Sequence, residues 1–311
     1  GPPPGGQPAP QPAAGGAGPR AEEQEAESAD HAPEDAEDGV DDTRISRDVF
    51  LLHRDRATPS EQASDMMERV DLMAAAASAQ AAGFELLGAS AHAAPSWEYP
   101  LCDLARNCFV GHLPAAVPEA RASELLAGVM NGMDILGWDR PASSMGRMSR
   151  GTKWMVSDGC RCPYRYGGVS VDPTPFPQWM NDLVAEIMPL VGLPERETWP
   201  NSCNLNCYTD GTDGIDWHTD DEPLFQGRER PCAIVSLSLG EARTFELRLA
   251  EEREGAASSQ LRLRGGDLCT MEGNVQRYYE HRIPKASAKN LRLRVNLTWR
   301  WITQHDRRCG L

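Results

Sequence analysis

The clearest alternation of polar and apolar positions lies near the C-terminal end of the chain. Side chains two apart in a β-strand point to the same face, so strict alternation predicts a strand with one polar and one apolar face. The polar positions are Arg294, Asn296, Thr298 and Arg300, and the apolar ones are Val295, Leu297 and Trp299.

Short apolar runs recur at close intervals from Asn201 onward, separated by turn residues such as Gly265 and Gly266. Many short strands without long helices between them favour an antiparallel double sheet or jelly roll. The predicted strands span 203–208, 215–219, 232–239, 243–250, 260–264, 267–271 and 291–302.

Apolar residues at helical spacing predict three helices before residue 200. The first follows Pro59, with Ser60 able to cap it, and fades at Gly83. The segment 84–100, with Gly, Ala, Ser and two Pro, is typical of a linker. The apolar faces are Met66, Met67, Val70 and Met73 in the first helix; Leu125, Leu126, Val129 and Met130 in a second, from Pro118 to near Gly132; and Trp179, Leu183, Ile187 and Leu190 in a third over 177–191.

Charge is distributed unevenly along the 311 residues, whose formal net charge is −15. Residues 20–48 contain twelve Asp or Glu and three Arg, a net of −9, which leaves −6 for the remainder. Together with the Gly/Pro-rich residues 1–19, this run cannot bury enough apolar surface to fold, so we expect 1–48 to be disordered; the alternative is an acidic partner-binding tail. We expect a helical segment and linker over 49–100 and the functional domain over 101–311.

Nine cysteines are scattered along the chain without an evident disulfide framework. The pairs Cys160/Cys162 and Cys203/Cys207 lack the spacing of a paired zinc motif. We therefore expect reduced, structural cysteines in a nuclear or cytoplasmic monomer. No stretch has the length and apolarity of a membrane span, and we expect no membrane association.

A basic, aromatic stretch runs from 140 to 168 and contains one Asp, Asp158. Basic groups suit phosphates and aromatic rings suit bases, the two requirements for binding single strands or flipped bases. The alternative is a solvated surface hairpin. The basic residues are Arg140, Arg147, Arg150, Lys153, Arg161 and Arg165, interleaved with Trp154, Tyr164 and Tyr166.

An H-x-D pair, His218 and Asp220, offers two metal ligands on one side of a strand or turn. With one distant His they would form the two-His, one-carboxylate facial triad, which leaves three positions open on Fe(II). His281 is the best candidate, because the other His that follows the pair, His305, lies in a polar tail. Alone, an H-x-D pair also arises by chance.

Arg294 and Arg300 would be costly on the inward face of a barrel without anionic partners. A dicarboxylate co-substrate would supply such partners through bidentate guanidinium–carboxylate pairing. Asn206 and Tyr208 share one face of their strand and can add neutral donors. The alternative is that both arginines pair with Asp or Glu of the protein.

Taken together, these residues resemble the AlkB-like Fe(II)/2-oxoglutarate dioxygenases, most closely the eukaryotic branch that repairs alkylated nucleic acid. The resemblance is strong from about 201 to 301 and weaker over 101–200. The motifs that carry it are Asn206-Cys207-Tyr208, Asp216-Trp217-His218-Thr219-Asp220-Asp221-Glu222, Arg243-Thr244-Phe245-Glu246, Gly266-Asp267-Leu268, Met271-Glu272-Gly273, Gln276, His281-Arg282-Ile283-Pro284-Lys285 and Arg294-Val295-Asn296-Leu297-Thr298-Trp299-Arg300.

The resemblance implies an α+β, mainly β fold, a double-stranded β-helix (jelly roll) with flanking helices. It also implies Fe(2+) as cofactor, 2-oxoglutarate as co-substrate and O2 as oxidant. In the resemblance, the iron ligands are His218, Asp220 and His281. The co-substrate residues are Tyr208 and Arg294 at the distal carboxylate with Asn296 nearby, and Asn206 and Arg300 at the metal-side end.

The resemblance further implies that Asp221 contacts the damaged base and acts in catalysis, with Glu222 beside it. The stretch 140–168 falls where the family places its nucleotide-recognition lid, so Tyr166 would stack on an extruded base. Tyr164 would assist, and Trp154 is a further candidate for substrate binding. The start of this stretch departs from the family, because Met145, Gly146 and Met148 stand where some duplex-acting members insert a bulky apolar wedge.

The function implied is oxidative demethylation of N-alkylated bases in DNA or RNA, with hydroxylation of the methyl group and release of formaldehyde. A second hypothesis keeps the cofactors and changes the substrate to a protein or RNA mark. A third, of another class, is a non-catalytic nucleic-acid-binding module. The complete ligand set and the inward-facing pair of Arg294 and Arg300 argue against the third hypothesis.

Overall fold

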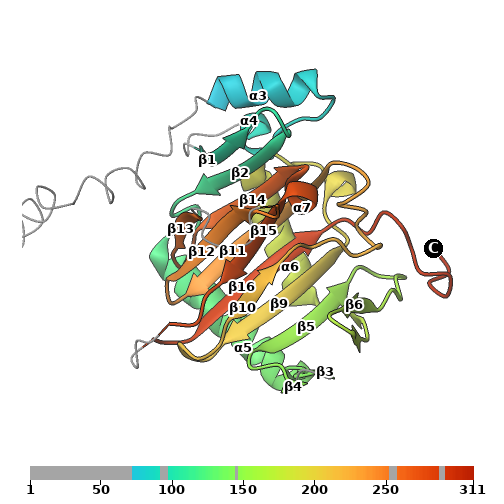
Figure 1. Ribbon diagram of the computed structural model, residues 1–311. Helices are drawn as coiled ribbons and strands as arrows, with labels where there is room; N and C mark the ends of the chain where they lie inside the picture. Colours follow the sequence, from blue (N-terminus) through green and yellow to red (C-terminus); the bar gives the residue numbers. More distant parts are fainter. Residues whose placement is uncertain (1–71, 92–96, 144–145, 252–257, 287–290) are drawn as a thin grey trace, which may run out of the picture. The chain divides into compact units, whose positions relative to one another are not determined.

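Two β-sheets packed face to face form the centre of the structure (Figure 1). The computed structural model describes residues 72–91, 97–143, 146–251, 258–286 and 291–311, which all belong to one unit, Ala57–Leu311. Buried residues of both sheets meet in one apolar cluster that includes Tyr208 and Ile234 from the larger sheet and Phe245 and Leu247 from the smaller. This arrangement confirms the predicted mainly β jelly roll with flanking helices.

The larger sheet has eight strands, in the order β1-β2-β14-β11-β16-β9-β5-β8. Neighbouring strands are antiparallel except β5 and β8, which are parallel. In chain order the strands are β1 (Glu98–Asp103), β2 (Cys108–Leu113), β5 (Gly151–Val156), β8 (Thr174–Pro175), β9 (Ser202–Tyr208), β11 (Cys232–Gly240), β14 (Leu268–Gly273) and β16 (Arg294–Arg300).

The smaller sheet has four antiparallel strands in the order β10-β15-β12-β13. Two short hairpins, β3-β4 and β6-β7, complete the β structure of the described residues. The bounds are β10 (Ile215–His218), β12 (Arg243–Leu249), β13 (Ser259–Leu263) and β15 (Tyr279–Ile283) in the sheet, and β3 (Ala142–Ser143), β4 (Gly146–Arg147), β6 (Tyr164–Tyr166) and β7 (Val169–Val171) in the hairpins.

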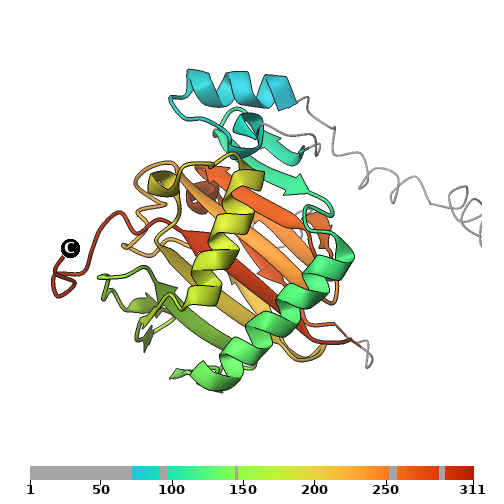
Figure 2. The same ribbon diagram turned by 180° about the vertical axis from the view of Figure 1, so that it is seen from behind.

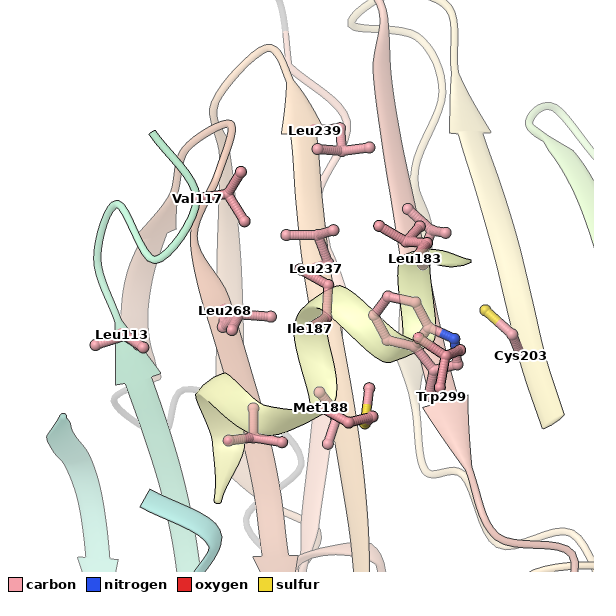
Figure 3. Packing of buried hydrophobic residues seen from close by; sticks show 14 of the residues in the cluster. Leu113, Val117, Leu183, Ile187, Met188, Cys203, Leu237, Leu239, Leu268 and Trp299 are labelled. Carbon is pink, nitrogen blue, oxygen red and sulfur yellow. The ribbon is translucent and has the colours of Figure 1, made fainter. Parts of the chain in front are cut away.

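Two helices, α5 (Glu119–Leu136) and α6 (Gln178–Ile187), cover the outer face of the larger sheet (Figure 2). Leu183 and Ile187 of α6 point at apolar side chains of the strands beneath, among them Trp299 (Figure 3). Full burial of each such aliphatic side chain contributes roughly 1.5–3 kcal/mol. The remaining helices are α3 (Leu72–Ala81), α4 (Leu87–Ser90), α7 (Val275–Tyr278) and the 3-10 turns η2 (Met188–Val191) and η3 (Arg196–Thr198). None of the described helices has the length and apolarity that crossing a membrane requires.

Strand β16 has the two faces that its alternating sequence predicts. Its apolar side chains, such as Leu297 and Trp299, lie in the core under the helices. Its polar side chains line a pocket between the sheets. All seven residues are buried, so the polar face looks into the barrel rather than into solvent.

The linker predicted for 84–100 is wrong, because its described residues include α4, the start of β1 and several buried side chains. Leu86, Trp97 and Tyr99 are buried, and Tyr99 donates a hydrogen bond to Glu272 (3.1 Å). The folded domain therefore extends N-terminal to residue 101. The first predicted helix overlaps α3, whereas most of its Met stripe and the tail 1–48 lie outside the described residues.

Glycines explain two further details of the fold. Gly132 lies inside α5, four residues before its last residue, Leu136. A Cβ there would lie only 2.5 Å from the indole nitrogen of Trp179, so the close approach of Trp179 requires glycine. Gly266 adopts a positive φ of 92° and approaches the carbonyl of Val117 so closely that a Cβ would be 2.2 Å from its oxygen. The predicted turn at 265–266 thus requires glycine.

Candidate active site

The three predicted iron ligands meet where β10 and β15 pair. His218 and His281 are register partners across the two strands, with ring centroids 4.2 Å apart. Asp220 follows two residues after His218, and one ligand atom from each residue lies within 4.8 Å of the others. His281 lies inside β15, a strand over 279–283 that is absent from the predicted set.

Both histidines are held in the neutral form that binds metals. The Nδ1 of His218 lies 2.8 Å from the carbonyl oxygen of Asp216, which leaves its Nε2 as the ligand atom. Burial lowers the pKa of His218, although Asp220 opposes the effect. Burial, with the nearby His218, lowers the pKa of His281 to about 3.

Asp220 is oriented by two contacts on different parts of the residue. Its backbone N–H donates to Oε1 of Gln276 (2.9 Å). Its Oδ2 accepts hydrogen bonds from Arg300, while Oδ1 lies 3.8 Å from Nε2 of His218. Burial alone would raise the pKa of Asp220, but Arg300 and the two histidines outweigh it and lower the pKa. The carboxylate is therefore ionised and presents Oδ1 to the histidines. Gln276 belongs to the resemblance, but the sequence indicated no role for it.

Arg294 provides a buried cation with free hydrogen-bonding capacity. Its side chain is 1% exposed, and Nη2 donates to Ser238 (3.1 Å). Among the described residues no acceptor satisfies Nε or Nη1, so the buried guanidinium keeps free N–H groups. The guanidinium also lies 5.1 Å from the centroid of the Tyr208 ring. A carboxylate bound in the pocket could accept hydrogen bonds from these free N–H groups.

Arg300 behaves differently from Arg294, because it pairs with a carboxylate of the protein itself, Asp220. The alternative that the arginines pair with internal acids thus holds for Arg300 and not for Arg294. Nη1 of Arg300 has no partner among the described residues. The contact of Arg300 with the metal-side end of the co-substrate therefore stays a prediction.

The predicted co-substrate residues surround one enclosed pocket of about 60 Å³, room for several waters or one small anion. Asn296 faces Asn206 across the β16–β9 pair, and Arg294 faces Tyr208. Asn296 donates to Ser236 (2.6 Å). The pocket lining comprises Asn206, Tyr208, His218, Asp220, His281, Arg294, Asn296 and Arg300 together with apolar and small polar residues of both sheets.

A second, more open cavity of about 430 Å³ adjoins the ligand cluster. His218 and Asp220 line both spaces, so the candidate metal site borders both of them. The outer cavity is also lined by Arg150, Tyr164, Arg165, Tyr166, Asp221 and Glu222.

The predicted substrate residues differ in their access to this cavity. Trp154 is fully buried and its indole N–H donates to the carbonyl of Cys162 (2.8 Å), so its assignment to substrate binding is wrong. The ring of Tyr164 stacks on that of Trp154, with 4.7 Å between the ring centroids. Tyr164 is itself buried and forms part of the cavity lining. Tyr166 is only partly buried and is the aromatic ring best placed for a ligand in the cavity.

The two acidic residues after Asp220 also differ. Asp221 is paired with Arg228 (3.2 Å) at the cavity rim. Glu222 is buried, and burial together with Asp220 raises its pKa to about 7. Its Oε2 has no hydrogen-bond partner among the described residues.

The basic stretch 140–168 does not form one surface. Lys153 lies in β5, a strand that is buried along its whole length, and it pairs with Asp139 (3.3 Å). Arg150 donates to Asn206 (2.8 Å), and Arg165 pairs with Asp306 (2.8 Å). The predicted lid thus contains one core strand and a short hairpin, β6-β7, that reaches the cavity. Met145 and the side chain of Arg147 lie outside the described part of the structure.

The residues present fit the cofactors of a non-haem iron oxygenase. Two neutral imidazoles and one ionised carboxylate match a facial Fe(II) site. The free N–H groups of the buried Arg294 guanidinium suit a carboxylate of a small dicarboxylate.

The model of the 2OG-Fe(II) oxygenase superfamily matches residues 110–300, and the chain belongs to this superfamily. Membership implies Fe(2+), 2-oxoglutarate and O2 as cofactor, co-substrate and oxidant.

The curated relatives that the chain matches are AlkB homologues, which confirms the AlkB-like resemblance. Rat alpha-ketoglutarate-dependent dioxygenase alkB homolog 3 is 36% identical over 149 residues, 45% of this chain and 47% of the relative. Bovine DNA oxidative demethylase ALKBH2 is 31% identical over 155 residues, 48% of this chain and 52% of the relative. The chain spans about half the length of these relatives. A solved chain described as the structure of OsALKBH1 aligns with 62% of this chain and 96% of its own length, with a TM-score of 0.45 and 17% identity.

Proposed function

We propose that this protein is an oxidative demethylase of N-alkylated bases in nucleic acid. The observation that carries the proposal is that His218 and Asp220 line two adjoining spaces. The smaller pocket is also lined by Arg294, which keeps free N–H groups, and the outer cavity is lined by Tyr166. A small dicarboxylate and a larger substrate can therefore reach the same metal from two adjoining spaces.

When bound, Fe(2+) with 2-oxoglutarate and O2 supplies the chemistry that hydroxylates an N-methyl group, which then leaves as formaldehyde. The protein's own residues hold and orient the participants. His218, His281 and Asp220 would hold the metal, with Gln276 and Asp216 fixing the direction of two of these ligands.

In this proposal Arg294 and Tyr208 hold the distal carboxylate of 2-oxoglutarate, with Asn296 nearby, and Asn206 lies toward the metal. The buried rings of Tyr164 and Phe225, 6.0 Å apart, exclude water on the side of Arg300.

Three features favour a nucleic acid as substrate over a protein. The outer cavity has the volume of a small-ligand site and carries a partly buried ring, Tyr166, on which a base can stack. Arg150 and Arg165 line the same cavity and suit phosphates. One relative is itself named a DNA oxidative demethylase.

Reduced cysteines at all nine positions support a nuclear or cytoplasmic protein.

The proposal is tested by replacing Tyr166, since stacking of one base on an aromatic ring contributes about 1–3 kcal/mol. Tyr166→Ala should raise the concentration of methylated oligonucleotide needed for half-maximal turnover by roughly 5- to 150-fold. Tyr166→Phe keeps the ring and should remain within a few-fold of wild type. Decay of 2-oxoglutarate without oligonucleotide should persist in both variants.

The measurement is formaldehyde release together with mass spectrometry of the repaired base, on methylated DNA and RNA in single-stranded and duplex form. If Tyr166→Ala leaves the oligonucleotide kinetics unchanged, the cavity assignment fails. If none of the methylated nucleic acids is repaired while 2-oxoglutarate is consumed, a protein substrate becomes the better hypothesis.

A further inference from the structure

Four metal-binding side chains gather at a second place in the molecule, away from the three candidate iron ligands. Cys160 and Cys162 lie between β5 and β6, and His305 and Cys309 lie in the C-terminal segment after β16. One ligand atom from each residue lies within 4.8 Å of the other three. The fold thus brings together two pairs that are 143 residues apart in the chain.

The distances among these atoms match those around one tetrahedral zinc ion. Zn–S bonds of about 2.3 Å and Zn–N bonds of about 2.0–2.1 Å place two sulfurs about 3.8 Å apart and a sulfur and a nitrogen about 3.6 Å apart. Sγ of Cys160 lies 3.7 Å from Sγ of Cys309. Nδ1 of His305 lies 3.9, 3.5 and 3.3 Å from the sulfurs of Cys160, Cys162 and Cys309 respectively.

The same distances argue against a disulfide in this structure. A disulfide joins its sulfurs at about 2.0 Å, far shorter than the 3.7 Å between Cys160 and Cys309. All three cysteines are free thiols.

Backbone amides point at two of the sulfurs, as expected around metal-bound thiolates. The N–H of Arg161 donates to Cys309 and that of Asp306 donates to Cys162, each at 3.2 Å. Such donors stabilise negative charge on sulfur and fix the direction of the ligand.

We propose that Cys160, Cys162, His305 and Cys309 bind one structural Zn²⁺ ion. Four protein ligands close the coordination shell, which is typical of a structural rather than a catalytic zinc. Within their own segment Cys160 and Cys162 lack the spacing of a paired zinc motif, so the sequence did not predict a zinc site there. A C-x-C pair and an H-x3-C pair complete the set only after the chain has folded.

The zinc would tie the C-terminal segment to the start of β6. Cys162 is two residues before Tyr164, and its carbonyl accepts the hydrogen bond from Trp154. The buried part of the cluster belongs to the same apolar group as Trp154, Tyr164 and Phe225, beside the outer cavity. The ion would therefore hold the base of the hairpin that carries Tyr166. Binding releases the remaining thiol protons to solvent and involves no change of oxidation state.

The test uses cobalt in the full-length protein, because Co²⁺ reports the ligands around it. Protein purified without metal and titrated with Co²⁺ should develop thiolate-to-cobalt charge-transfer absorption and the strong visible bands of a tetrahedral site. Both should saturate at one equivalent and be lost on addition of one equivalent of Zn²⁺. The candidate iron site contains no sulfur ligand, so this absorption distinguishes the two sites.

Cys162→Ser and Cys309→Ser should lose the charge-transfer absorption of the complete site and weaken zinc binding by about 100-fold or more, since even outer contacts of a metal site contribute about 10- to 100-fold. Cys102→Ser, outside the cluster, should bind one zinc as wild type does. Circular dichroism checks the fold of each variant.

The wild-type titration alone can overturn the proposal, whether or not the variants fold. Absence of the thiolate absorption, or its persistence at full strength in folded Cys162→Ser and Cys309→Ser, would show that these residues do not form the site. A Cys160–Cys309 disulfide found by mass spectrometry in protein purified anaerobically would overturn it too, as would iron found at the cysteines.

Discussion

Replacing Arg294 probes the co-substrate pocket most directly. Its guanidinium is fully buried, yet Nε and Nη1 have no acceptor among the described residues. No carboxylate of the described chain forms an ion pair with it, in contrast to Arg300 with Asp220. A buried cation without an anionic partner is costly, and burial accordingly lowers the pKa of Arg294. A carboxylate of a bound dicarboxylate would neutralise the charge and accept hydrogen bonds from the guanidinium.

The magnitude follows from the type of contact that Arg294→Ala removes. Truncating one partner of a buried, hydrogen-bonded charge pair costs about 2–5 kcal/mol, or roughly 30-fold to a few thousand-fold in affinity for 2-oxoglutarate. Arg294→Lys retains the charge without the planar fork and should lie between wild type and Arg294→Ala. Arg196→Ala changes an exposed arginine of η3 and serves as the control.

Two assays measure the effect independently. Succinate release at varied 2-oxoglutarate gives the concentration for half-maximal turnover. Equilibrium unfolding without oxygen gives ligand stabilisation, which is about 2.7 kcal/mol at 100 times the wild-type Kd and falls to about 0.4 kcal/mol when Kd rises 100-fold. A folded Arg294→Ala protein that binds 2-oxoglutarate within three-fold of wild type would refute the assignment of this pocket.

Three further changes test other parts of the structure. Replacing His218, Asp220 or His281 by Ala should abolish turnover and iron retention, because a facial triad has no spare ligand; full turnover with bound iron in any of these variants would remove that residue from the site. Deleting residues 1–48 should leave turnover unchanged or raise it at low salt, where their −9 charge repels a polyanion; lost turnover with iron still bound would give the tail a role. Burial raises the pKa of Glu272 above its ordinary value of 4.5, so its contribution to stability is full below pH 4.5 and is lost as the pH rises through the folded value. Glu272→Gln should therefore gain stability relative to wild type as the pH rises above 4.5, and a pH-independent difference in denaturant unfolding would contradict this.

The parts of the site that the sequence predicts correctly are those set by local spacing. A period of two places Arg294 and Asn296 on one face of β16 whatever the strand packs against. The H-x-D spacing likewise places His218 and Asp220 near each other. His281 needed more information, because its closeness to His218 arises from the pairing of β10 with β15.

Burial was the property that the sequence predicted least well. The stretch 140–168 has the composition of a basic surface, yet β5 lies between β9 and β8 in the larger sheet. Trp154 and Lys153 are therefore buried, and Lys153 is compensated by Asp139 from outside the strand. Composition describes a segment alone, whereas burial depends on which strands the fold places on either side of it.

The two clusters of ligands also differ in how far local sequence predicts them. In the candidate iron site, two of three ligands are neighbours in the chain, and one long-range strand pairing adds the third. In the Cys160–Cys309 cluster, neither local pair contains enough ligands to hold zinc, and neither spacing is characteristic. The pairs meet because the C-terminal segment after β16 returns to the loop between β5 and β6, where Ile302 is buried beside Cys160 and Trp154. Such a metal site can be recognised only from the three-dimensional structure, because neither pair alone is a zinc motif. Loss of the ion should therefore affect the C-terminal segment and the loop between β5 and β6 together.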